Sequence, residues 1–195
     1  MLTILEKIGS KLKLVLASNS PRRKQFLTDY GFEFDICSSH FLETTKETSP
    51  EKIVTAFAFG KASEVFKRLN DNNLVVLGAD TVVSLNGVVL GKPKDKKDAI
   101  KMLKSLSNQT HQVFTGYSIV SKDCVLTDFC VTDVIFNELS DELIEKYVNT
   151  GSPMDKAGAY GIQDGFDLVK KINGSYNNVV GLPIEIIEKQ LKKLL

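Results

Sequence analysis

The sequence predicts an α/β fold built on a mixed β-sheet flanked by helices, and three observations support this prediction. Short apolar runs alternate along the chain with longer segments whose apolar residues recur at helical spacing. Asn86-Gly87 joins two strand-like runs, which is the strongest short signal for an antiparallel hairpin. A further pair of strand-like runs lies at 111–120 and 124–136. Because helical crossovers favour parallel strands and hairpins are antiparallel, we expect both kinds of pairing in one sheet.

The composition indicates a globular chain that forms a single domain over residues 1–195, without a separable linker. Of its 195 residues, 43% are hydrophobic and 25% are charged, which is enough apolar material for a sizeable core. The formal net charge of +1 argues against a protein that binds nucleic acid along its surface. Any site for anions must therefore be local.

Nothing in the sequence predicts a membrane protein or a secreted one. The longest apolar runs fall well short of the roughly 18 residues that a spanning helix needs, and the first 13 residues are too short and too charged for a signal peptide. Cys37, Cys124 and Cys130 lack the spacing of a metal site, and their odd number is typical of reduced thiols. We therefore expect no membrane association and a cytoplasmic location.

Residues 14–31 predict a buried strand, a serine-containing loop and a helix. The run 14–17 is continuously apolar, as in strands that are covered on both faces. Ser20 is a good helix N-cap, Pro21 suits the first helical position, and Gly31 is placed to end the helix.

The start of this helix is a candidate phosphate site. Its unpaired backbone N–H groups carry a partial positive charge that attracts anions. Arg22 and Arg23 add two guanidinium groups, which match phosphate oxygens bidentately. The alternative is an ordinary capped surface helix with two solvated arginines.

The next elements are a strand at 32–37 and a long helix at 50–69. Ser49 is the expected N-cap and Pro50 the first helical residue of this helix, which presents a broad apolar face. Lys61 lies at the side of that face. Its aliphatic stem could simply extend along apolar surface, which is the alternative to a role in a site.

The hairpin predicted over residues 74–93 brings polar side chains to its open end. A two-residue turn at Asn86-Gly87 pairs the flanking residues, and counting back along both strands sets Asp80 opposite Pro93 and Thr81 opposite Lys92. Convergence of these side chains on one ligand needs a bend or bulge, for which Gly78 and Gly91 are suitable.

Asp80 interrupts a long apolar strand, where an unpaired carboxylate would be costly. It is therefore a candidate functional residue. The alternative is a carboxylate at the end of a strand, hydrogen-bonded to Thr81 or to the backbone.

The second half of the chain predicts a helix at 95–106, strands at 111–120 and 124–136 joined through 121–123, and a helix at 141–149 capped by Ser140. A glycine-rich segment follows and carries Asp155, Lys156 and Gln163 on a loop and a short strand. A last helix starts near Pro183. The two histidines have no catalytic or metal-binding partner at a recognisable spacing, so we assign them no role.

Taken together, several segments resemble the Maf family of nucleoside triphosphate pyrophosphatases. They occur in the family's order over about residues 13–185: "LASNSPRRKQFL", "FGKASEV", "GADTVV", "LGKPKD", "HQVFTG", "DKAGAYGIQ" and "GSYNNVVGLP". The resemblance implies a fold like that of the inosine triphosphate pyrophosphatases, with an elongated mixed sheet and two lobes around a cleft, in a homodimer. It also implies hydrolysis of a nucleoside triphosphate to the monophosphate and pyrophosphate with a divalent metal, Mg²⁺ or Mn²⁺.

The resemblance further implies roles for individual positions. Asp80, Lys61 and Lys92 would be catalytic, and Glu43 and Asp80 would hold the metal. The residues implied in substrate binding are Ser18, Arg22, Arg23, Thr81, Asp155, Lys156 and Gln163. Asp80 would also orient or deprotonate the attacking water.

The segment "AGAYGIQ" resembles the branch of the family that acts on dTTP, UTP and modified uridine triphosphates, and the amide of Gln163 could read the edge of a pyrimidine. One alternative is the same reaction on 7-methyl-GTP or another modified nucleotide. Another is a nucleotide-binding regulator of cell division with little turnover. Ser152 and Asp164 stand where the family often has a glutamate and a glycine, which leaves the metal stoichiometry and the base pocket open.

Overall fold

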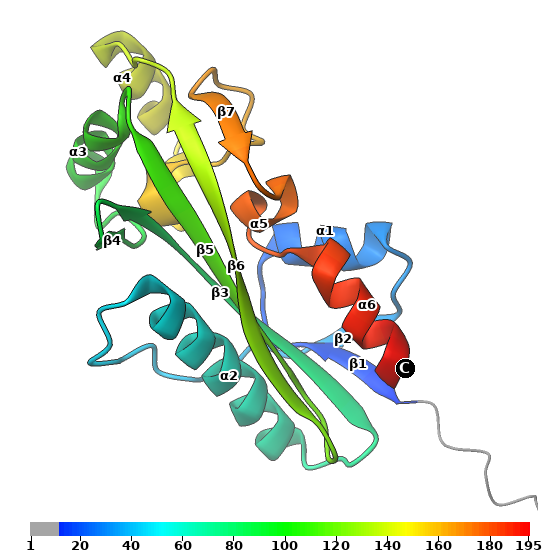
Figure 1. Ribbon diagram of the computed structural model, residues 1–195. Helices are drawn as coiled ribbons and strands as arrows, with labels where there is room; N and C mark the ends of the chain where they lie inside the picture. Colours follow the sequence, from blue (N-terminus) through cyan, green and yellow to red (C-terminus); the bar gives the residue numbers. More distant parts are fainter. Residues whose placement is uncertain (1–11) are drawn as a thin grey trace, which may run out of the picture.

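The computed structural model describes residues 12–195, which form a seven-stranded sheet with helices on both faces (Figure 1). Most of the amino-terminal segment considered above for a signal peptide lies outside the described residues. The strands are β1 (Lys13–Leu16), β2 (Phe34–Ile36), β3 (Leu74–Leu85), β4 (Val88–Leu90), β5 (Thr110–Val120), β6 (Val125–Phe136) and β7 (Val169–Asn173). The α-helices are α1 (Pro21–Asp29), α2 (Pro50–Leu69), α3 (Lys96–Leu106), α4 (Asp141–Asn149), α5 (Tyr176–Val180) and α6 (Ile184–Leu194). Two short 3₁₀ helices, η2 (Ser152–Asp155) and η3 (Ala157–Ala159), lie between α4 and β7.

The sheet is mixed, as predicted. The strand order is β2-β1-β3-β5-β6-β7, and β4 pairs with β3 beside this path. β1 runs parallel to β2 and β3, whereas β3, β5, β6 and β7 form antiparallel neighbours. The predicted α/β fold class is therefore confirmed. In the part of the chain that the structure describes, no helix is long and apolar enough to cross a bilayer.

One edge of β3 is shared by two short strands that leave a gap between them. β1 pairs with the beginning of β3, up to Leu16 opposite Leu77, and β4 pairs with its end, from Leu90 opposite Val83. Between these ladders, residues 78–82 of β3 have no strand partner on that side among the described residues. We call this stretch the open edge of β3. The opposite edge of β3 pairs continuously with β5 over the same residues.

The predicted turn is confirmed, since Leu85 pairs with Val88 across Asn86-Gly87. Both turn residues have positive φ, 50° and 80°, as a two-residue hairpin turn requires. The predicted pairing of Asp80 and Thr81 with Pro93 and Lys92 is wrong, because the β3–β4 ladder ends at Leu90. The chain leaves the sheet at Gly91 instead, and this departure creates the open edge.

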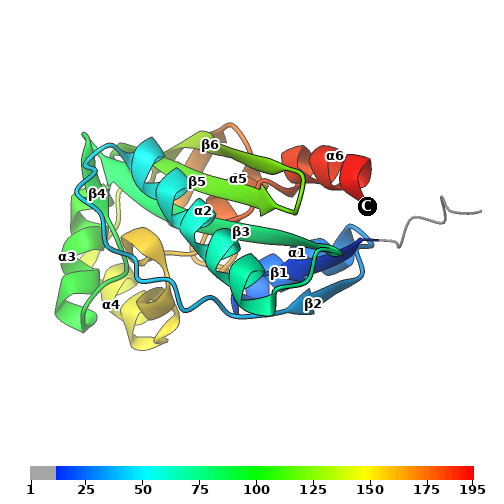
Figure 2. The same cartoon turned by 90° about the horizontal axis from the view of Figure 1, so that it is seen from below.

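α2 covers one face of the sheet, across β3 and β5 (Figures 1 and 2). Its close approach depends on two glycines beneath it. A Cβ on Gly78 would lie 2.4 Å from the carbonyl oxygen of Ala58, and one on Gly116 would lie 2.4 Å from the carbonyl oxygen of Val54. The missing side chains let the helix backbone rest directly on the strands, which brings the helix's inner residues close to the side chains of β3.

The opposite face carries two separate apolar clusters at the two ends of the sheet. α1 and α6 pack on one end through Leu27, Ile187 and Leu191, against strand residues such as Leu77. α3 and α4 pack on the other end, where Leu103 and Tyr147 lie among other buried residues (Figure 1). α5 follows β7 and leads to α6. The open edge of β3 lies between the two clusters.

Most helix boundaries follow their predicted local signals. The hydroxyls of Ser20 and Ser140 cap α1 and α4, and the carboxylate of Asp95 caps α3. Ser49 occupies the N-cap position of α2, but its side chain makes no capping hydrogen bond. The short strand expected near Gln163 is absent, because η2, η3 and turns occupy residues 152–165.

Candidate active site

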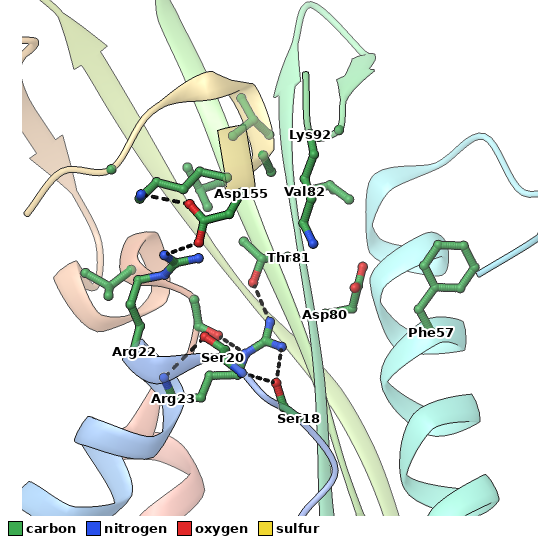
Figure 3. A pocket seen from close by; sticks show the side chains of 18 of the residues that line it. Ser18, Ser20, Arg22, Arg23, Phe57, Asp80, Thr81, Val82, Lys92 and Asp155 are labelled. Atoms are coloured by element: carbon green, nitrogen blue, oxygen red, sulfur yellow. Dashed lines mark hydrogen bonds and ion pairs between the residues drawn. The ribbon is translucent and has the colours of Figure 1, made fainter. Parts of the chain in front are cut away.

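A cavity of about 690 Å³ opens at the open edge of β3, a volume typical of a small-molecule site. Its walls come from the β1–α1 loop, the segment before α2, α2 itself, the end of the hairpin and the segment 155–163 (Figure 3). All the residues assigned to a site from the sequence line it: Ser18, Arg22, Arg23, Glu43, Lys61, Asp80, Thr81, Lys92, Asp155, Lys156 and Gln163. Their convergence on one cavity is a finding, and their individual roles stay predictions.

The cavity reaches both faces of the sheet because neighbouring residues of a strand point to opposite sides. Asp80 faces α2, where it meets Lys61. Thr81 faces the other side, where its hydroxyl accepts a hydrogen bond from Nη2 of Arg23 at 3.2 Å and contacts Thr115 at 3.0 Å. With no strand covering the open edge, one ligand can contact both side chains.

Arg23 is fixed at the start of α1 by groups from distant parts of the chain. Its Nε donates to the carbonyl of Gly181 at 2.9 Å, and Nη1 donates to the hydroxyl of Ser18 at 3.4 Å. Burial lowers the pKa of the Arg23 guanidinium, and the charge of Asp80 opposes this shift. The side chain is thus a rigid, mostly desolvated cation, which strengthens its attraction for phosphate oxygens.

Arg22 points into the cavity from the same turn and binds Asp155 across it. Nη1 of Arg22 lies 3.0 Å from Oδ2 of Asp155, and Nζ of Lys156 lies 2.9 Å from Oδ1 (Figure 3). Partial burial works to raise the pKa of Asp155, but these two hydrogen bonds lower it overall. Asp155 therefore links the helix start to the segment that carries Gln163.

Lys156 is held by groups of the protein rather than extended into the cavity. Besides Asp155, its ammonium donates to the carbonyl and the hydroxyl of Ser152, at 2.6 and 3.0 Å. An ammonium has three protons, so these contacts occupy all of them. To bind substrate as predicted, the ammonium of Lys156 must therefore exchange one of these contacts for a contact with the substrate.

Lys61 extends from α2 between two carboxylates. Its Nζ lies 2.7 Å from Oε1 of Glu43 and 2.7 Å from Oδ1 of Asp80. The alternative of a lysine that merely covers apolar surface is thereby excluded for Lys61. Burial raises the pKa of Asp80, and the nearby charges of Lys61 and Arg23 oppose the rise.

Glu43 and Lys92 complete this side of the cavity. Burial works to raise the pKa of Glu43, yet Lys61 and the charge of Lys92 lower it overall. Lys92 is exposed and points toward Asp80 from the end of the hairpin (Figure 3). It forms no ion pair with a residue in the described range 12–195, so its ammonium is available to an anion.

The donor set fits a hard divalent cation whose remaining ligands come from elsewhere. The carboxylates of Glu43 and Asp80 lie close together because both contact the ammonium of Lys61. Of the two carboxylate oxygens of Asp80, only Oδ1 accepts a hydrogen bond from the described residues. Mg²⁺ is commonly held by one or two carboxylates together with substrate phosphates and water. Within residues 12–195 no group of three or more acidic, histidine or cysteine side chains is arranged so that it could hold a metal ion by itself.

The segment that carries Glu43 is anchored on α2 by residues that the sequence analysis missed. Oε2 of Glu64 accepts hydrogen bonds from the hydroxyl of Ser39 and the backbone N–H of His40, both at 2.9 Å. Arg68 donates to the carbonyl of Ser38 at 2.7 Å. Glu64 and Arg68 are four residues apart on a predicted helix, and this spacing indicates an ion pair between them. It does not indicate that the pair also contacts residues 38–40.

The two positions that depart from the family pattern lie next to each other. The hydroxyl of Ser152 donates to Oδ2 of Asp164 at 2.7 Å, and Nζ of Lys156 lies 3.4 Å from the same oxygen. A carboxylate is thus present beside Lys156, although residue 152 does not supply it. The sequence carries no signal that these two positions lie together.

Comparison with known proteins supports the family resemblance over nearly the whole chain. The Maf-like protein family matches residues 13–194. A dTTP/UTP pyrophosphatase of Thermococcus onnurineus is 48% identical over 177 residues, covering 90% of this chain and 95% of the relative. A dTTP/UTP pyrophosphatase of Clostridium perfringens is 46% identical over 186 residues, covering 93% and 96% of the two chains.

A solved structure confirms the fold. The Staphylococcus aureus Ham1 protein superimposes with a TM-score of 0.54 at 14% identity, covering 93% of this chain and 98% of the other. At this identity the likeness concerns the fold alone. The family match and the close relatives carry the classification, and this chain belongs to the Maf-like protein family.

Proposed function

We propose that this chain hydrolyses dTTP, UTP and uridine triphosphates with modified bases to the monophosphate and pyrophosphate. One observation carries the proposal: a buried carboxylate, Asp80, lies beside Lys61 in a cavity that also contains Arg22, Arg23 and Lys92. The relatives that bear the name dTTP/UTP pyrophosphatase support this substrate choice.

The cationic residues would bind the triphosphate and reduce its charge. Arg22 and Arg23 at the start of α1 are suited to phosphate oxygens, and Lys92 approaches from the opposite wall. Without such neutralisation, the negative charge of the phosphates would repel an attacking nucleophile. Because Arg23 is already fixed by hydrogen bonds, little reorganisation is needed when the substrate binds.

Asp80 would act as the general base. As a water molecule attacks phosphorus, its proton passes to the Asp80 carboxylate, the anhydride bond between the α- and β-phosphates breaks, and pyrophosphate leaves with the bonding electrons. Burial raises the pKa of Asp80, which makes the carboxylate a stronger base, while Lys61 keeps enough of it ionised to act.

We further propose that Glu43 and Asp80 hold Mg²⁺ or Mn²⁺. Bound there, the ion would supply Lewis-acid stabilisation of the phosphate charge that develops during cleavage. The hydrogen bonds of Glu64 to Ser39 and His40 support this assignment, because they restrain the segment from which Glu43 extends.

The test is pyrophosphate release from dTTP, UTP, modified uridine triphosphates, 7-methyl-GTP and the other standard nucleotides, with Mg²⁺, Mn²⁺ or EDTA. We expect preference for dTTP and UTP, loss of activity in EDTA, and loss in Asp80→Asn. Asp123→Asn, which alters an exposed aspartate of the turn between β5 and β6 outside the cavity, should retain activity. A preference for 7-methyl-GTP would overturn the base assignment, and tight binding without turnover would indicate a nucleotide-binding regulator instead.

We also propose a homodimer that acts in the cytoplasm. Residues 125–132 of β6 have no partner on one edge among the described strands, and Val125, Phe129 and Val131 are exposed there. Such an edge favours pairing with a second copy. Light scattering of the native chain should give twice the monomer mass, and Phe129→Lys should shift it toward the monomer; a native monomer would contradict the dimer. Cell fractionation tests the proposed cytoplasmic location.

A further inference from the structure

Asp164 lies behind the wall of the cavity and holds together three parts of the chain. Oδ2 accepts hydrogen bonds from the hydroxyls of Tyr147, at 2.6 Å, and Ser152, at 2.7 Å. Oδ1 accepts from Nε2 of Gln163 at 3.1 Å. The Asp164 side chain is 11% exposed and lies outside the residues that line the cavity, whereas Gln163 lines it.

The surroundings of Asp164 hold it in this position. Burial raises the pKa of Tyr147 far above its ordinary value. The phenol therefore keeps its proton and donates a hydrogen bond to Asp164. The same hydroxyl accepts the backbone N–H of Gly161 at 2.9 Å, and Lys156 supplies a cation 3.4 Å from Oδ2. The carboxylate therefore has little freedom to turn away from Gln163.

The contact determines which end of the Gln163 amide is available to a ligand. An ionised carboxylate only accepts hydrogen bonds, so the amide atom facing Asp164 must be the nitrogen. The other end, Oε1, is then the group left for a molecule in the cavity. Gln163 thus presents an acceptor and not a donor.

Gly161 makes room for this arrangement. A Cβ at this position would lie 2.7 Å from Oδ1 of Asp164 and 2.7 Å from Nε2 of Gln163. These are the two atoms joined by the hydrogen bond, so any side chain at residue 161 would push them apart.

We propose that Asp164 is a positioning residue that holds the Gln163 amide with its oxygen toward the ligand, and so selects a base with an N–H donor on the facing edge. Uracil and thymine carry such a donor at N3, whereas N3 of cytosine is an acceptor. The proposal rests on the proposed function, since it concerns the base of the same substrate. A cytosine in this place would set two acceptors against each other and leave the amide oxygen unpaired, which is the main source of discrimination.

The experiment compares kcat/KM for UTP, CTP and N3-methyl-UTP in the native enzyme and in Asp164→Asn. We expect the native enzyme to prefer UTP over both others by about tenfold, because the amide oxygen of the exposed Gln163 loses one hydrogen bond to the base. In Asp164→Asn the new amide can donate to Gln163, which releases the side chain to present its nitrogen. The UTP/CTP ratio should then fall by about tenfold or more.

Two further variants separate positioning from general damage. Gly161→Ala keeps both Asp164 and Gln163 in the sequence, but its Cβ would push their side chains apart. This variant should also lower the UTP/CTP ratio of kcat/KM. Asp167→Asn changes an exposed aspartate close in sequence whose contact is with Asn137, and should leave the ratio unchanged. A purely structural role for Asp164 would reduce kcat/KM for UTP and CTP by the same factor, and an unchanged ratio in Asp164→Asn would overturn the proposal.

Binding of α,β-methylene-UTP and α,β-methylene-CTP, measured by calorimetry, distinguishes this proposal from the proposed function. If these analogues bind with the expected preference while no triphosphate is cleaved, the hydrolase assignment fails and base selection stands. If UTP and CTP are cleaved equally well by the native enzyme, the hydrolase assignment stands and the role of Asp164 is refuted. Equal binding of the two analogues, or binding of neither, also refutes it.

Discussion

Replacing Lys61 by methionine tests the electrostatic arrangement around Asp80. Methionine keeps the length and apolar stem of the side chain but removes the cation that lies 2.7 Å from Oδ1 of Asp80 and 2.7 Å from Oε1 of Glu43. Burial raises the pKa of Asp80, and the charge of Lys61 is the strongest influence against that rise. Without Lys61, the pKa of Asp80 should therefore increase further.

The size of the increase follows from distance and burial. At 2.7 Å and an effective dielectric constant of about 20, the gross attraction between the two charges is about 6 kcal/mol. Part of this is offset because Arg23 remains nearby and because solvent rearranges around the altered site. An opposite charge in direct contact changes a carboxyl pKa by about 1–3 units in proteins, and we expect a rise in this range.

The assay is the pH dependence of kcat/KM for pyrophosphate release, which reports ionisations of the free enzyme. In the proposed mechanism Asp80 must be ionised to accept a proton, so the acid limb of the profile should move to higher pH by about 1–3 units in Lys61→Met. Where turnover is too slow, titration of the Asp80 carboxyl by NMR gives the same quantity. Lys52→Met is the matched control on α2, since Lys52 forms an exposed pair with Glu47 at 3.6 Å. An acid limb that coincides with that of the native enzyme would refute the reasoning.

Three further changes test the packing and the buried charges. Gly78→Ala places a Cβ 2.4 Å from a backbone carbonyl oxygen of α2 and should lower the free energy of unfolding by about 1–3 kcal/mol in urea denaturation, whereas Gly91→Ala, with nothing within 4 Å of its Cβ, should not; equal losses would contradict the packing argument. Burial lowers the pKa of His111 from 6.5 to about 4, so the folded state holds it neutral and stability should fall as the pH drops from 6.5 to 4, by about 3 kcal/mol. His111→Asn should flatten that dependence, and an unchanged slope would count against it. The hydrogen bond from Arg68 lowers the pKa of Glu64 from 4.5 to about 2, so the stability that ionised Glu64 contributes should be lost as the pH falls through this range; Glu64→Gln, measured by the same denaturation series, should lack this loss.

The local elements of the fold were predictable because their signals are local. α2 spans Pro50–Leu69 as predicted, since proline at its first position and a continuous apolar face define it without help from the rest of the chain. The strand β7 and the five-residue helix α5 were not predicted. β7 is half-exposed and gains its order by pairing with β6, a contact between residues far apart in the sequence.

The chemistry of the site was predictable, but its geometry was not. Asp80 stood out because a carboxylate in an apolar strand is costly unless it is paired, whereas Lys61 was singled out by the family resemblance; the structure pairs the two. Their arrangement depends on where β4 leaves the sheet, which the hairpin turn does not determine. The contact between Ser152 and Asp164 likewise arises from the path of η2 and η3, for which the sequence offered no pairing signal.

β3 belongs to every apolar cluster of the described molecule. Its residues Leu77 and Val83 lie in the clusters at opposite ends of one face, and Val76 and Val82 lie in the two clusters beneath α2. Neither end of the sheet can therefore lose its packing without exposing part of the strand that carries Asp80. The chain should unfold as one cooperative unit, and the amide protons that β3 donates to β5 should exchange with solvent only at the full free energy of global unfolding. The carboxylate of Asp80 thus lies on the last part of the molecule to open.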